Sequence, residues 1–318
     1  MKKYIVLALA LVLILSVALT GCAPQKVNLI LATGGTSGTY YPYGGSIAQI
    51  FNSKVANMNV TAQATGASVE NLKLIGKKEA ELAIVQNDMT DYAYNGTETF
   101  KDGKIENVRA IATLYPEVIQ IVATTDSGIN SIQDIKGKKF SVGAPGSGVE
   151  ANARQLLDVM GMTYNDFTAN YLSFAESADS FKDKHIDGFL FTSGIPNAAI
   201  QDISTTSDLK FVSVPDDVIN NLTSKYPFFT AYTIPAGTYK GQDADVKTIA
   251  VKATLVVGAE VSEKVVYDLT KALFENQPEL AQANAKGKEL KLEDAVKGIS
   301  VPFHAGAEKY FKEKGAIK

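Results

Sequence analysis

The segment from Ala32 to Ser46, ATGGTSGTYYPYGGS, constrains the fold of this chain more than any other. Just before it, the apolar residues from Val27 to Leu31 predict a short buried strand. After it, apolar residues recur at intervals of three and four up to Val55, which predicts a helix. Glycines and hydroxyl side chains stand between the two. The chain therefore contains a strand–loop–helix unit that is typical of α/β folds.

The loop of this unit has the chemistry of a small-anion site. The start of a helix carries unpaired backbone N–H groups and a partial positive charge. Glycine lets a ligand approach that backbone closely, and Thr36, Ser37 and Thr39 add hydroxyl donors. A carboxylate or a phosphate fits such a loop. An ordinary strand-to-helix turn capped by serine or threonine explains the same residues, and this stretch alone does not decide between the two.

The same order of elements returns later in the chain. Lys139–Val142 predicts a strand, Gly143–Gly148 is a second glycine-rich loop, and Val149–Met160 has helical periodicity. Two α/β lobes that each offer a helix N-terminus would be able to close on one ligand. We expect the first lobe to comprise residues 27–115 plus 236–318 and the second lobe to comprise residues 116–235.

Strands alternate with helices along most of the chain, which predicts a mostly parallel sheet. Ligands bind such sheets beyond the carboxyl ends of the strands. Residues 33–40, 66–68 and 86–88 each follow a predicted strand, so we expect them to meet at that edge.

Three further expectations concern the lobe crossings and the C-terminus. Pro116 separates two β-rich runs where the chain first passes between the lobes. The extended stretch 230–235 is expected to cross back toward the first lobe. Amphipathic helices are expected at 261–274 and 293–312, packed on the first lobe.

The N-terminus has the pattern of a targeting segment. Lys2 and Lys3 precede an almost wholly apolar run, which ends in Leu-Thr-Gly-Cys at residues 19–22. This ending resembles the lipobox of bacterial lipoproteins, in which the cysteine is lipidated and becomes the first residue of the mature chain. We therefore expect a signal peptide at residues 1–21, a lipidated Cys22 with a tether to residue 26, and an extracytoplasmic protein anchored to the membrane. A plain signal peptide or a membrane-anchor helix are the alternatives.

Composition excludes several classes of function. Cys22 is the only cysteine, so disulfides, thiolate catalysis and cysteine-based zinc sites are not expected. The formal net charge is −3, and the basic residues are scattered, which does not favour nucleic-acid binding. Arg109 and Arg154 are the only arginines. An anionic ligand would therefore be held largely by backbone N–H groups, hydroxyls and amides.

Motifs for enzyme chemistry are weak. Gly146–Ala151 fits the dinucleotide pattern G-x-G-x-x-A, with Asp166 further on, but one such match carries little weight. Gly143–Gly148 has the glycine spacing of a P-loop, but Val149 and Glu150 replace its lysine and hydroxyl residue. The chain contains no G-x-S-x-G and no H-E-x-x-H sequence.

Isolated titratable residues favour structural roles. Two histidines, His185 and His304, do not make a zinc site by themselves. Solvation is the expected role of His185, and helix capping or packing that of His304. The aspartates at 179, 183 and 187 are typical of a solvated helix face. Arg154 either pairs with a surface acid or contacts a bound carboxylate, and both interpretations stay open.

At Ala32–Gly45 the sequence resembles the TAXI family of solute receptors, the extracytoplasmic binding proteins of one class of TRAP transporter. The resemblance extends through Thr65–Asn71, Leu82–Asp88, Asp134–Lys139 with Gly143–Gly148, and Val301–Ala307, and so covers nearly the whole mature chain. It implies a type II periplasmic-binding-protein fold, which has two α/β lobes with the ligand in the cleft between them. It also implies a small-carboxylate ligand, such as glutamate or a dicarboxylate, and an integral membrane permease as partner.

We therefore predict a receptor that closes on its solute by hinge motion, with no catalytic residue, cofactor or metal. A secreted enzyme on the same scaffold, using His304 or a carboxylate, and a ligand sensor for a signalling receptor are the alternatives. The predicted ligand-binding residues are Thr36, Ser37, Gly38, Thr39, Tyr40 and Gln86 from the first lobe, and Ser147, Gly148, Val149, Thr192, Ser193, Gly194 and Asn197 from the second.

Overall fold

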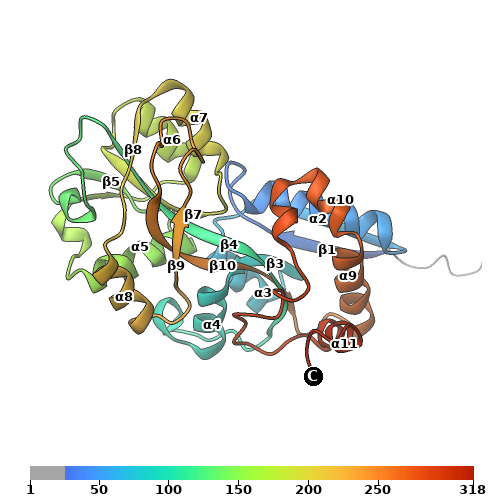
Figure 1. Ribbon diagram of the computed structural model, residues 1–318. Helices are drawn as coiled ribbons and strands as arrows, with labels where there is room; N and C mark the ends of the chain where they lie inside the picture. Colours follow the sequence, from blue (N-terminus) through green and yellow to red (C-terminus); the bar gives the residue numbers. More distant parts are fainter. Residues whose placement is uncertain (1–25) are drawn as a thin grey trace, which may run out of the picture.

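The computed structural model describes residues 26–318, which form two α/β lobes joined by two long strands (Figure 1). This confirms the predicted fold class. The signal peptide and Cys22 lie outside the described residues.

The first lobe is built on three parallel strands. β1 (Val27–Ala32) lies between β2 (Met58–Gln63) and β3 (Leu82–Gln86), and the register places Leu31 opposite both Ala62 and Leu82. Helices α2 (Tyr40–Lys54), α3 (Ser68–Lys77) and α4 (Asn87–Asn95) each follow one of these strands. The inner strand β3 is buried along its whole length, whereas β2, at the edge of the sheet, alternates buried and exposed residues. The carboxyl ends of all three strands point toward the second lobe.

The second lobe repeats this arrangement. β5 (Lys139–Ser141) pairs in parallel with β6 (Thr168–Asn170) and with β7 (Gly188–Ser193). Each strand is followed by a helix, and one further strand and helix complete the lobe. These elements are α5 (Gly148–Val159), α6 (Phe174–Lys182), α7 (Ala198–Thr206), β8 (Leu209–Phe211) and α8 (Asp216–Lys225).

Two long antiparallel strands connect the lobes. β4 (Val108–Thr124) and β10 (Val246–Gly258) pair with each other and join all strands of residues 26–318 into one ten-stranded sheet. β4 is continuous, so the expectation of two runs separated at Pro116 is wrong. Proline lacks the N–H that a ladder needs, but the β4–β10 register shifts just beside it, between Ala253 and Thr254. The strand therefore passes the proline without ending.

The return crossing also differs from expectation. β9 (Thr230–Ile234) pairs antiparallel with the first residues of β10, so the stretch 230–235 stays in the second lobe. Tyr239, Val246 and Ala250 pack in one apolar cluster with Phe189 and Phe191 of β7. The chain changes lobe inside β10. The predicted lobe boundaries stay a prediction, and this packing places residues 239–250 with the second lobe.

The C-terminal helices cover the first lobe. α9 (Glu263–Glu275) contacts α2 and α11 (Ala305–Glu313), and α10 (Gln277–Ala283) lies beside α2 (Figure 1). The helix expected over 293–312 begins only at Ala305, after Pro302 and a parallel bridge between Phe303 and Ala110. Short 3-10 turns occur at Glu98–Phe100, Ile132–Ile135, Tyr164–Asp166 and Ala285–Glu289.

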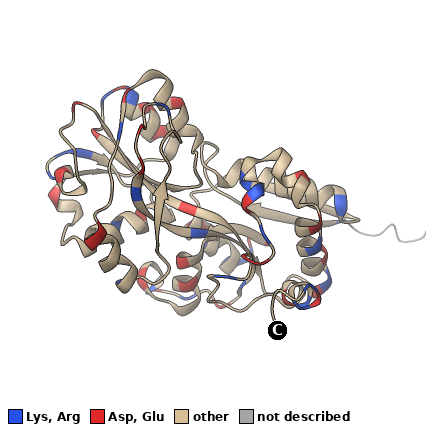
Figure 2. Cartoon of the chain, in the orientation of Figure 1, with Lys and Arg blue, Asp and Glu red and all other residues tan. Residues whose placement is uncertain are grey.

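Charged residues are spread over both lobes rather than gathered on one face (Figure 2). In the part of the chain that is described, no helix has both the length and the apolar composition needed to cross a bilayer.

Candidate ligand-binding site

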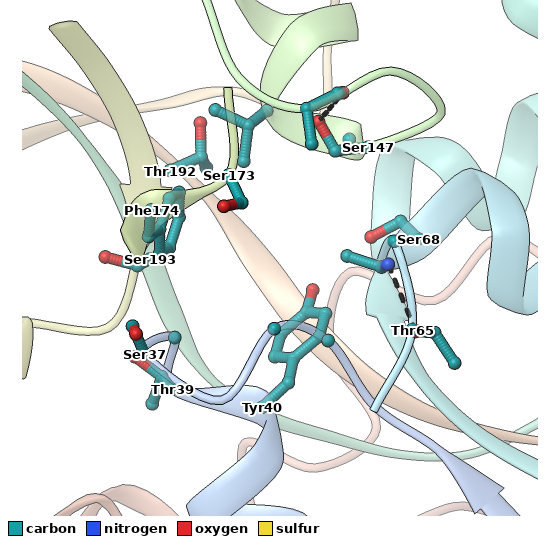
Figure 3. Close-up of a pocket in the computed structure, with 18 of the residues that line it drawn as sticks. Ser37, Thr39, Tyr40, Thr65, Ser68, Ser147, Ser173, Phe174, Thr192 and Ser193 are labelled. Carbon is teal, nitrogen blue, oxygen red and sulfur yellow. Dashed lines mark hydrogen bonds between the residues drawn. The ribbon is translucent and has the colours of Figure 1, made fainter. Parts of the chain in front are cut away.

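A cavity of about 200 Å³ lies between the two lobes. Its first-lobe wall consists of the loops after β1 and β2 and the last residue of β3, Gln86. Its second-lobe wall consists of the loops after β5 and β6 and the last two residues of β7, Thr192 and Ser193. Glu117 of β4 lines the cavity as well. Figure 3 shows Tyr40 and Ser68 on one side and Ser147, Ser173 and Thr192 on the other. The edge that sequence reasoning selected, at residues 33–40, 66–68 and 86–88, supplies most of the first-lobe wall.

Four helices begin at the cavity. The first residues of α2, α3, α5 and α6 are Tyr40, Ser68, Gly148 and Phe174, and all four line it together with the residues that precede them. A helix N-terminus presents unpaired N–H groups and about half a positive charge. The four backbone dipoles therefore make the cavity attractive to an anion.

The four N-termini differ in how they are capped. Ser147 accepts a hydrogen bond from Glu150 N at the start of α5, and Ser173 forms a reciprocal capping box with Glu176 at the start of α6. The residues before α2 and α3 are Thr39 and Ala67, and neither side chain forms a cap hydrogen bond. These differences do not change the number of free N–H groups, because the third residue of α2 is Pro42, which has no N–H, and the N–H of Glu70, the third residue of α3, donates to Gly146 O at 3.3 Å.

Most of the predicted ligand-binding residues meet at this cavity. The residues that line it are Thr36, Ser37, Gly38, Thr39, Tyr40, Gln86, Ser147, Gly148, Val149, Thr192 and Ser193. Gly194 and Asn197 are not among the lining residues. Contact of each lining residue with a ligand stays a prediction.

Gly194 and Asn197 make contacts within the protein beside the cavity. A Cβ at Gly194 would lie 3.1 Å from Thr39 Cγ2 and 2.9 Å from Lys286 Cε, so this glycine allows the lobes to approach closely. Asn197 Oδ1 accepts hydrogen bonds from Ala199 N and Ile200 N and caps α7. Ligand contact of both residues stays a prediction.

Sequence reasoning missed Thr65, Glu117, Ser173, Phe174 and Ala175. The Phe174 ring stacks on Phe191 at 4.0 Å between centroids and forms an apolar wall. The capping-box pattern of Ser173 and Glu176 was a usable signal, because it marks the start of α6 in the sequence. No sequence signal marks Glu117, which reaches the cavity from the middle of β4.

Glu117 is the only charged side chain that lines the cavity within residues 26–318. It is 2% exposed, and its Oε2 accepts a hydrogen bond of 2.5 Å from the Tyr40 hydroxyl. Burial raises the pKa of Glu117 to about 8. Burial, and then the Glu117 carboxylate, raise the pKa of Tyr40 well above its usual value, so Tyr40 stays protonated and donates.

A buried polar network joins the lobes beside the cavity. Gln86 Nε2 donates to Asn152 Oδ1 at 2.9 Å, and Asn152 Nδ2 donates to Asp88 Oδ2 at 2.8 Å. Further along α5, Gln155 Nε2 donates to the Tyr92 hydroxyl at 2.9 Å. Burial raises the pKa of Asp88 to about 7. These contacts connect α4 of the first lobe to α5 of the second.

The other titratable candidates lie away from the cavity lining. His304 caps α11, since its Nδ1 accepts from Gly306 N at 3.2 Å while Nε2 bonds to Val261 O at 2.8 Å. The Arg154 guanidinium pairs with Glu150 at 2.9 Å, which supports the surface-acid interpretation. No group of three or more metal-ligating side chains is found in the described part of the chain.

The fold defines a class of protein with a ligand cavity between two lobes. Among solved structures, the chain is similar to the alkanesulfonate-binding protein of Xanthomonas axonopodis pv. citri, with 13% identity, a TM-score of 0.53, and coverage of 91% of this chain and 85% of that one. A putative L-cystine ABC transporter protein of Listeria monocytogenes matches with 12% identity and a TM-score of 0.52, and the match covers 81% of this chain and 94% of that one. A phosphonate ABC transporter binding component of Pseudomonas aeruginosa matches with 12% identity and a TM-score of 0.54, and the match covers 82% of this chain and 79% of that one. These likenesses confirm the two-lobed periplasmic-binding-protein fold. The chain belongs to the NMT1-like family, which it matches over residues 31–315.

Proposed function

We propose that this protein is the extracytoplasmic solute-binding receptor of a TRAP-type importer of the TAXI class. It captures a small carboxylate, glutamate-like or a dicarboxylate, between its lobes and delivers it to an integral membrane permease. A lipid on Cys22 anchors it to the membrane. The proposal makes the protein a binding protein and not an enzyme.

One observation carries the ligand class. Four helix N-termini converge on a cavity between the lobes that no Lys, Arg or His side chain lines within residues 26–318. Backbone dipoles of this kind suit a small carboxylate better than a neutral solute. The solved structures similar in fold include proteins named for sulfonates, phosphonates and cystine, which is compatible with an anionic head group.

Closure of the lobes is the proposed mechanism. β4 and β10 are the two strands shared by both lobes, so bending near Pro116 and Ala253 would open the cavity. A ligand that contacts both walls binds the closed form better than the open form and shifts the population toward it.

A thermal-shift screen of the purified protein tests the ligand class. The panel contains small carboxylates, amino acids, sugars and inorganic phosphate. A solute that binds only the folded protein adds about 2.7 kcal/mol of stability at a hundred times its dissociation constant. We expect carboxylates to raise the melting temperature and sugars to leave it unchanged. Stabilisation by sugars alone would contradict the proposal.

A further inference from the structure

Glu117 occupies an unusual place for a carboxyl group in a cavity built to attract anions. It lies on β4 directly after Pro116, at the crossing between the lobes, and is almost completely buried. The Tyr40 hydroxyl is its one hydrogen-bond donor in the described chain, and it donates to Oε2. A carboxylate accepts about four hydrogen bonds, so most of this capacity is unused.

No lysine, arginine or histidine within residues 26–318 forms an ion pair with Glu117. Lys286 is near enough to lower its pKa slightly, but the Lys286 ammonium is held by Glu289 at 2.6 Å. Asp88 acts in the opposite sense and raises the pKa of Glu117. A buried carboxylate without a cationic partner is costly, because little in its surroundings replaces water. The free protein therefore holds Glu117 largely neutral at pH 7.

Two more polar atoms of the cavity lining lack a hydrogen-bond partner within residues 26–318. Gln86 donates its amide N–H to Asn152, which leaves its Oε1, an acceptor, buried without a partner. Thr192 Oγ1 belongs to a hydroxyl group, which both donates and accepts, and it is buried without a partner as well. The lining thus offers backbone N–H groups and hydroxyls as donors for a carboxylate, and Gln86 Oε1 and Glu117 as acceptors for an N–H group.

We propose that Glu117 is a specificity-determining residue that accepts hydrogen bonds from a ligand's ammonium group. The cavity then prefers a carboxylate that also carries an ammonium group over the same acid without it. This inference rests on the proposed function and narrows its ligand class.

The proposal has a proton-linked signature. Burial raises the pKa of Glu117 to about 8, so the free protein carries a proton there at pH 7. An adjacent ammonium group favours the ionised carboxylate. Binding therefore releases the Glu117 proton to solvent, and affinity rises as the pH is raised from 6 toward 8, by up to tenfold per pH unit. Tyr40, Asp88 and Lys286 are the titratable groups that act on Glu117 from other elements.

Isothermal titration calorimetry on matched pairs of acids tests the inference. The pairs are L-glutamate with glutarate and L-valine with 3-methylbutanoate, which differ only in the amino group. Each titration is repeated at pH 7 in two buffers of different ionisation enthalpy. The difference between the two observed binding enthalpies reports the number of protons released. We expect at least one amino acid to bind tenfold or more tightly than its partner, with release of up to one proton.

Variants assign the effect to Glu117. Glu117→Gln is expected to weaken the amino acid by tenfold or more and to abolish proton release, while the deaminated acid changes by less than threefold. Glu106→Gln, an exposed carboxyl paired with Lys104, is the control and should change nothing. Asp88→Asn should reduce proton release without abolishing it, because Asp88 contributes to the raised pKa of Glu117 but burial is the larger cause. The melting temperature without ligand identifies any variant that fails to fold, and the wild-type buffer comparison does not depend on the variants.

The outcomes separate this inference from the proposed function. Equal or tighter binding of the deaminated acids, or uptake of a proton, would overturn the role of Glu117 and leave a carboxylate receptor in place. Failure of both members of every pair to bind, with binding of a sugar, would overturn both.

Discussion

Replacing Gly148 with alanine places a methyl group where the two lobes touch. Gly148 is the first residue of α5, and an added Cβ would lie 1.9 Å from Gln86 Oε1 and 2.6 Å from Gln86 Cδ. Gln86 is buried and held by Asn152 at 2.9 Å, so its side chain moves away only by breaking that bond. The substitution therefore obstructs the closed arrangement of the lobes.

The magnitude follows from two contributions. Overpacking of a close contact costs about 1–3 kcal/mol. Loss of the Gln86–Asn152 hydrogen bond costs about 0.5–1.5 kcal/mol more. Together they amount to roughly 2–4 kcal/mol against closure, which weakens ligand binding by about 30-fold to several hundred-fold at 1.4 kcal/mol per tenfold. The fold itself is spared, because alanine is tolerated in the first turn of a helix and each lobe keeps its own core.

Calorimetric titration with the acid that gives the largest thermal shift measures this effect. Gly45→Ala is the matched control, since an added Cβ there meets no atom within 4 Å. The radius of gyration from small-angle scattering should fall on ligand addition in the control and not in Gly148→Ala. A second substitution, Gln86→Ala, removes the atoms that the new methyl group strikes and should restore part of the closure.

Unchanged ligand affinity in Gly148→Ala would refute the reasoning. It would mean that α5 does not close on the ligand, and the second-lobe wall would have to be withdrawn from the site. A melting temperature without ligand that falls by more than a few degrees would instead locate the damage in the fold.

Three further predictions concern stability. Burial raises the pKa of Asp88 to about 7, so the unfolded chain loses this proton near pH 4 while the folded protein keeps it. The free energy of unfolding should therefore fall between pH 4 and 7 by up to about 1.4 kcal/mol per pH unit. Urea titrations of Asp88→Asn should show a flatter slope. His304→Ala removes the cap of α11 and should cost about 0.5–2 kcal/mol in chemical unfolding, with the ligand dissociation constant unchanged because His304 does not line the cavity; tenfold weaker binding would contradict this. Gly306→Ala places a Cβ 2.3 Å from Glu263 O and 2.5 Å from Tyr267 N, which are both backbone atoms. The substitution should destabilise the packing of α11 on α9 by about 1–3 kcal/mol. A melting temperature equal to that of Gly45→Ala would count against this prediction.

The sequence predicts the local units of this fold well. Apolar periodicity and nearby glycines determine the strand–loop–helix unit around Ala32–Ser46. They also determine the helix expected at Val149–Met160, which is observed at Gly148–Val159. Because each unit places its loop at the carboxyl end of a strand, both walls of the cavity could be anticipated from short windows of sequence.

Features that depend on distant residues could not be predicted in this way. Glu117 meets Tyr40 across 77 positions of sequence, and no motif surrounds it. The continuity of β4 through Pro116 depends on a register shift in β10, more than a hundred residues later. The late start of α11 at Ala305 depends on the bridge between Phe303 and Ala110. Each of these is decided by a tertiary partner that local propensity does not contain.

No arginine lines the cavity within residues 26–318, and this suits the buried Glu117 carboxyl. An arginine at the cavity would bring a fixed cation next to Glu117 and would hold that carboxyl ionised in the free protein. Helix N-termini supply positive potential without doing so, because their charge is partial and spread over backbone N–H groups. Glu117 is then able to stay neutral until a ligand brings its own cation. The helix N-termini at the cavity and the Glu117 carboxyl of β4 therefore act together, because the ligand's carboxylate meets the N–H groups and its ammonium group balances the charge of Glu117.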